Sequence, residues 1–121
     1  MCKVDDLNHL IEKKKEQEES YLFEKRKVND LLNEYDGLRE TTNQFNHHLL
    51  ERYCDSRILS HLEQNSEMFQ FGHRRTMRAL YDKQNGINKD IRCLNNDIID
   101  IERRRDKVLE AEYEKGVHHK Q

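Results

Sequence analysis

The stretch that decides the fold is Met77–Val108, MRALYDKQNGINKDIRCLNNDIIDIERRRDKV. Alternating steps of three and four residues through it meet ten positions, of which eight are apolar: Met77, Leu80, Gln84, Ile87, Ile91, Leu94, Ile98, Ile101, Arg105 and Val108. This spacing averages 3.5 residues and places the side chains on one narrow face of a helix, as in a coiled coil. Because the residues between them are polar, the stretch predicts a helix that needs a partner helix along one seam.

The composition fits a protein with a thin core. Of the 121 residues, 38% are charged and 34% hydrophobic, and the mean hydropathy is −1.18. Such a composition argues against a large globular core. The chain has no proline, and its apolar residues recur at helical spacing, which favours long helices over a disordered chain. Two helices that meet along a seam need few apolar residues.

Overall charge and cysteine content exclude several classes of function. The net charge is −2, so nothing in the overall electrostatics favours binding to nucleic acid or an anionic membrane. Short basic runs lie beside acidic residues, which indicates ion pairs along a helix; the alternative is an acidic protein partner. Three widely spaced cysteines predict neither a disulfide framework nor a zinc site. Without a hydrophobic leader or a long apolar segment, we expect a soluble intracellular protein.

The first half of the chain carries a weaker seam. An apolar stripe starts at Val4, and residues Lys14 to Gln17 then interrupt it with polar side chains. The seam resumes with Tyr21, Val28, Tyr35, Thr42 and Leu49, and with Leu31, Leu38 and Phe45 three residues after Val28, Tyr35 and Thr42. Gly37 weakens the helix by roughly 1 kcal/mol relative to Ala. In a hairpin, we expect the polar Lys14–Gln17 segment to face Arg105 and beyond, and that end to pair poorly.

The two seams predict an all-α antiparallel coiled-coil hairpin. A possible capping box, Ser60 to Glu63, lies between them, and we place the turn within about residues 54–66. Arm one then spans about 4–54 and arm two about 66–116, with Gly116 as its cap and 117–121 as a loose tail. The alternative is one continuous helix that dimerises with another chain.

The sequence contains none of the motifs that carry catalysis. It lacks a phosphate-binding loop, a nucleophile elbow, a zinc-protease motif and a dinucleotide fingerprint. His47, Cys54 and His61 share a helix face but lie about 10.5 Å apart along the axis, too far for one metal ion. His47 and Glu51 form at most half a site. We therefore expect no enzyme activity, no catalytic residue, no cofactor and no metal.

One surface cluster stands out just after the expected turn. Met68, Phe69 and Phe71 are followed by His73 and by two arginines. Aromatic residues, methionine and arginine are the types enriched at protein interfaces. The alternative interpretation is that Met68 and Phe69 cap the core of the hairpin near its turn.

The second half of the chain resembles a known family. The run Tyr81–Arg92, continued by Leu94, Ile98, Ile99 and Ile101, is similar to the Lys-Gln, Ile, Ile, Leu and Ile-Ile pattern of the InvI branch of type III secretion stalk proteins. These central-stalk proteins form the FliJ/YscO/InvI (SpaM) group. The similarity covers about a third of the chain.

The resemblance implies a protein without catalysis of its own. It would insert in a hexameric secretion ATPase, link ATP hydrolysis to an export gate protein, and engage export chaperones, with no nucleic-acid partner and no membrane insertion. Its location would be cytoplasmic, at the secretion apparatus on the inner membrane. The runner-up function is a coiled-coil secretion chaperone or adaptor that dimerises and shields an amphipathic client helix.

Position along the hairpin assigns residues to these partners. The expected ATPase-binding residues are Lys13, Lys14, Lys15, Arg103, Arg104 and Arg105. The expected gate-binding residues are Met68, Phe69, Phe71 and His73.

Overall fold

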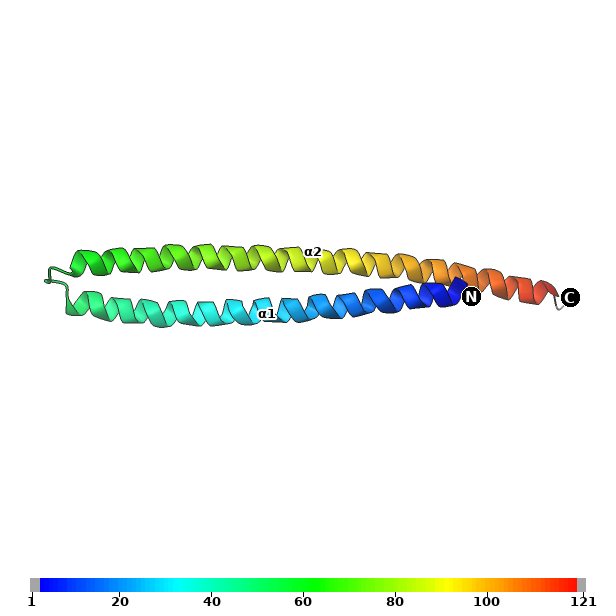
Figure 1. Cartoon of the computed structure of the whole chain (residues 1–121), viewed down its shortest axis with the longest axis horizontal. Helices are drawn as coiled ribbons and strands as arrows, with labels where there is room; N and C mark the ends of the chain where they lie inside the picture. The colour runs from blue at the N-terminus through cyan, green and yellow to red at the C-terminus, as the bar shows by residue number, and fades with distance from the viewer. Residues whose placement is uncertain (1–2, 120–121) are drawn as a thin grey trace. The chain divides into compact units, whose positions relative to one another are not determined.

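The protein is a hairpin of two antiparallel helices. The computed structural model describes residues 3–119, in which α1 spans Lys3–Arg52 and α2 spans Leu59–His119 (Figure 1). These described residues contain no strand, and the predicted all-α hairpin is confirmed. Helix α2 continues through Gly116 to His119, so that glycine does not end it. The last two residues of the tail predicted at 117–121 lie outside the described residues.

The connection between the helices occupies residues 53–58. The Leu49 carbonyl accepts a hydrogen bond from the Tyr53 amide at 3.0 Å. The Tyr53 carbonyl accepts one from the Ser56 amide, also at 3.0 Å. At the start of α2, the Ser56 Oγ accepts a hydrogen bond from the Ile58 amide at 3.3 Å. A serine side chain that satisfies an amide at a helix start replaces one of the missing backbone partners. Ser60 lies inside α2, so the possible capping box from Ser60 to Glu63 does not begin the helix; Ser56 instead bonds to the amide of Ile58, the residue before α2.

Contacts divide the hairpin into two units, each built from one segment of α1 and one of α2. The terminal unit comprises Met1–Glu24 and Ile87–Gln121, and the turn unit comprises Lys25–Gly86. In the terminal unit, a buried cluster joins the two helices: Ile11, Leu94, Ile98 and Ile101, with Leu7 and Tyr21 packed against it. The members of this cluster on α2 all belong to the predicted seam.

In the turn unit, α1 keeps the predicted seven-residue repeat and loses the other half of the predicted seam; the repeat that is kept, buried or half-buried, is Val28, Tyr35, Thr42 and Leu49. Val28 and Leu32 are buried, whereas Leu31, Leu38 and Phe45 are exposed, so the prediction that these three line the seam is wrong. Leu31 and Leu32 are about 100° apart on a helix, and only one of them can face α2. Leu32 does, because it continues the three-and-four spacing that leads from Ile11 through Tyr21 and Val28.

Polar side chains fix which residues face each other across the seam. In the terminal unit, Arg105 Nη1 donates to Asn8 Oδ1 at 3.2 Å, and Lys14 Nζ lies 3.7 Å from an Asp97 carboxylate oxygen. Lys14 therefore faces Asp97, and the expectation that it faces Arg105 is wrong. Four of the seven buried apolar side chains among the described residues lie in this cluster, which ends at Ile101 on α2; residues 109–116 beyond it are exposed.

The turn unit has its own polar contacts across the seam. Gln84 donates a side-chain hydrogen bond to Asn29, and the His73 ring bonds to the backbone carbonyl of Tyr35. A polar pair in a coiled-coil seam specifies register, because a shifted alignment would leave its atoms unpaired.

Replacing Ile98 by alanine should show how much its burial contributes to stability. Ile99 beside it is the same residue type and provides a matched control. Ile98 is buried and Ile99 is exposed. We expect Ile98→Ala to lower the free energy of unfolding by about 2–4 kcal/mol and Ile99→Ala by less than about 1 kcal/mol. Urea denaturation followed by circular dichroism measures both. Equal losses would show that the seam is wrongly placed.

Candidate functional site

The cluster predicted near the turn separates into two outward and two inward side chains. Met68 and Phe71 are 72% and 63% exposed and, with Arg74, line a shallow hollow on the surface of α2. Phe69 is half-buried and His73 is buried, which places both toward α1. Residues 68 and 71 point away from the seam because a helix turns about 100° per residue. A partner would therefore contact Met68 and Phe71 rather than all four residues.

His73 belongs to the helix interface. Its Nε2 lies 2.9 Å from the Tyr35 carbonyl oxygen. A carbonyl only accepts hydrogen bonds, so Nε2 carries the proton in this contact. The Phe69 ring lies beside it, with ring centroids 6.0 Å apart. The sequence places His73 in line with the seam, and the structure shows that the seam uses it as a core residue.

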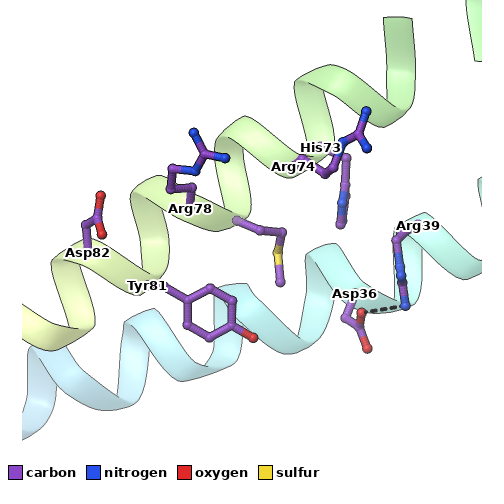
Figure 2. Close-up of a pocket in the computed structure, with 8 residues that line it drawn as sticks. Asp36, Arg39, His73, Arg74, Arg78, Tyr81 and Asp82 are labelled. Carbon is purple, nitrogen blue, oxygen red and sulfur yellow. Dashed lines mark ion pairs between the residues drawn. The ribbon is translucent and has the colours of Figure 1, made fainter. Parts of the chain in front are cut away.

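A hollow beside His73 brings together residues of both helices that are far apart in sequence. Figure 2 shows Asp36 and Arg39 on α1 facing Arg74, Arg78 and Tyr81 on α2 across this hollow. Arg39 Nη2 pairs with Asp36 Oδ1 at 3.1 Å. Three arginines and two aspartates line this hollow together with the half-exposed ring of Tyr81.

Three arginines on α2 contrast with this pair. Arg74, Arg75 and Arg78 are exposed, and none forms an ion pair with another residue of the described part of the chain. Together with Phe71 they line a second hollow. Guanidinium groups next to an exposed aromatic ring can bind carboxylates and also stack on planar groups. Sequence reasoning found Arg74 and Arg75 but missed Arg78, although Arg78 lies four residues after Arg74 and seven after Phe71, on the same face of α2.

The basic residues expected at the other site all lie in the terminal unit. Lys13, Lys15, Arg103 and Arg104 are exposed. Lys14 and Arg105 instead contact the opposite helix, through Asp97 and Asn8. The four exposed residues are therefore the ones available to a partner, while Lys14 and Arg105 help to align the helices.

The terminal unit also contains a helix end that no helix covers. In Figure 1, the C-terminal end of α2 extends past the start of α1. Leu109 and Tyr113, one turn apart, are exposed there, Tyr113 by 75%. An apolar pair one helical turn apart is a small binding surface for another protein. The sequence shows this apolar pair, and the structure shows that both side chains are exposed.

Chemical groups outside these surfaces do not form a reactive centre. His47 Nε2 pairs with Glu51 Oε1 at 3.0 Å, and both side chains are exposed. Within residues 3–119, no cluster of three or more histidine, cysteine or acidic residues is arranged to hold a metal ion. Cys54 and Cys93 are free and exposed. Among the described helices, none is long and apolar enough to cross a membrane.

Comparison with known proteins adds no relative. The chain matches no protein-family model, no curated protein and no solved structure at a significant level. The fold, the exposed side chains and the resemblance described above are therefore the observations that bear on function.

Replacing His73 should show whether it is a core residue. We expect His73→Ala to lower the free energy of unfolding by about 1–3 kcal/mol, because it removes a buried ring and its bond to α1. His61→Ala, at an exposed position of the same helix, should change it by less than about 0.5 kcal/mol. Thermal unfolding compares the two variants, and an unchanged His73→Ala protein would place that ring on the surface.

Proposed function

We propose that this protein is a non-enzymatic central stalk of a type III secretion ATPase complex. In this role the terminal unit inserts in a hexameric ATPase, and the turn unit contacts the export gate. The resemblance of residues 81–102 to the InvI branch suggests the role, and the observation that supports it best is the helical hairpin itself. A two-helix hairpin offers its partners two helix ends in one unit and a turn in the other.

The side chains available in each unit support this assignment. The terminal unit offers exposed Lys13, Lys15, Arg103 and Arg104, as well as the uncovered end of α2. Charged side chains that stay in water suit a partner that surrounds the helices without needing a dry interface. The turn unit offers exposed Met68 and Phe71 beside arginines that lack acidic partners among the described residues. In this proposal the protein acts in the cytoplasm, at the inner membrane.

A second function is favoured by one specific observation. Leu31, Leu38 and Phe45 form an exposed stripe with a seven-residue repeat. A helix that displays such a repeat can pack against another helix, which is what a coiled-coil adaptor does when it dimerises and shields a client. We place this function second because the stripe accounts for the turn unit alone.

The stalk proposal predicts stimulation of a partner enzyme. ATP turnover by the cognate secretion ATPase should rise when this protein is added. The double variant Arg103→Glu/Arg104→Glu should abolish most of that rise, because it reverses two exposed charges and breaks no described contact. Arg92→Glu, an exposed charge reversal in the same unit, serves as the control and should retain stimulation. Absence of both stimulation and co-migration for the unmodified protein would overturn the proposal.

The gate contact predicts a different phenotype. Phe71→Ala should reduce secretion by cells carrying the cognate system by about tenfold, a loss typical of a central aromatic contact, while the helicity of the protein stays unchanged. Phe23→Ala removes another exposed ring, in the terminal unit, and should leave secretion near normal. Circular dichroism and a secretion assay measure the two effects. Normal secretion by the Phe71→Ala cells would exclude Phe71 from the contact.

A further inference from the structure

One face of the turn unit carries a stripe of large apolar side chains on α1. Leu31, Leu38 and Phe45 are spaced seven residues apart and are 40%, 50% and 61% exposed. Leu38 lines a hollow of about 290 Å³ between the helices, together with Phe69 and Gly72 of α2. Side chains that repeat every seven residues form the seam of a coiled coil. The stripe is thus a second seam of α1, and no helix among the described residues covers it.

Small side chains occupy the matching positions of α2 on the same face. Gly72 shares the hollow with Leu38, and Asn65 and Ala79 lie seven residues on either side of it; all three are exposed. The helices are antiparallel, so a step of seven residues forward on α1 corresponds to seven back on α2. Leu31 is therefore level with Ala79, and Phe45 with Asn65. At these three levels the face has large side chains on α1 and small ones on α2, and the exposed Met68 of α2 lies between the levels of Leu38 and Phe45.

Such a face is complementary to itself. Consider a twofold axis that lies against this face and runs parallel to the helices. A half-turn about it places α1 of one copy against α2 of another at the same level. Each large side chain then meets a small one: Leu38 meets Gly72, Leu31 meets Ala79 and Phe45 meets Asn65. Facing positions that alternate large and small residues allow helices to interdigitate, and twofold symmetry repeats each contact twice.

Charges on the rim of this face match in the same arrangement. Glu34 lines a hollow with Leu31 and Leu38, so it borders the stripe. Tyr35 contacts His73 across the seam, and one step back on α1 is one step forward on α2, so Glu34 lies within one residue of the level of Arg75. Both are exposed, and neither forms an ion pair within the described part of the chain. The half-turn that matches the apolar side chains also places Glu34 of each copy next to Arg75 of the other.

We propose that the turn unit binds a second copy of this chain through this face, and that the two turn units form a symmetric four-helix bundle. The occupant is a second copy because one rotation matches both the sizes and the charges. This face shares Met68 and Arg75 with the surface proposed for the gate, whereas the basic residues proposed for the ATPase lie in the terminal unit, so stimulation of the ATPase tests the stalk function separately.

Sedimentation equilibrium of the full chain tests the proposal. The mass should rise with concentration from 14.8 kDa toward about twice that value. Leu38→Glu places a charge in the interface, and Gly72→Leu fills the site that Leu38 would occupy, so each should weaken dimerisation at least tenfold. A side chain at residue 72 has room within one chain, since nothing lies within 4 Å of an added Cβ. Circular dichroism should therefore show unchanged helicity.

Matched controls exclude general effects of these substitutions. Ile99→Glu places the same charge on an apolar side chain of similar exposure in the terminal unit, and Gly116→Leu fills another open glycine position. Both should dimerise like the unmodified protein. The charge pair supplies a stricter test: Glu34→Arg and Arg75→Glu should each weaken dimerisation several-fold, and the double variant should restore it to within about twofold.

Three results would overturn the proposal. A mass that stays at 14.8 kDa at every concentration would show that the protein is a monomer. The stripe would then bind another kind of helix, such as an adaptor's client. A dimer that Leu38→Glu and Gly72→Leu do not weaken would use a different face. Failure of the double charge variant to restore dimerisation would exclude the half-turn arrangement. Stimulation of the ATPase is measured separately, and its absence would leave the dimer proposal intact.

Discussion

The fold depends on one seam in which apolar side chains of α2 at alternating steps of three and four residues pack against α1. A single helix of this polarity has little reason to form by itself, because helix formation in water is only marginally favourable without tertiary packing. Leu94, Ile98 and Ile101 bury against Ile11, and the two helices stabilise each other through that contact. All other features, from the turn to the exposed surfaces, follow from which residues this seam selects.

Sequence reasoning identified the strong seam and the seven-residue repeat of the weak one, but it placed the intervening residues of the weak seam incorrectly. In α2 the apolar positions follow one register, so periodicity alone located the buried residues. In α1 the adjacent leucines Leu31 and Leu32 fit two registers, and only the alignment with α2 decides between them. The partner surfaces show the same limit. The sequence identified the exposed Phe71, but it did not reveal that His73 is buried or that Arg78 and Tyr81 join one hollow, because these depend on which face meets α1.

The exposed apolar stripe of α1 is as important for the surface of the protein as the seam is for its fold. Leu38 and Phe45 are exposed because they do not belong to the seam between α1 and α2. Leaving apolar side chains of a regular repeat in water costs free energy. A charged surface elsewhere keeps such a helix pair in solution. A thin seam, a second apolar stripe and arginines without ion pairs thus occur together among the described residues.

None of the described side chains is fully buried, and this has a consequence for how the hairpin opens. In a globular core, losing one contact disturbs many others. Here each seam layer contacts mainly the layers above and below it, so opening can begin locally and stop after a few turns. Amide hydrogen exchange should therefore slow gradually from the helix ends toward the buried layers, because one segment can open while neighbouring layers stay closed.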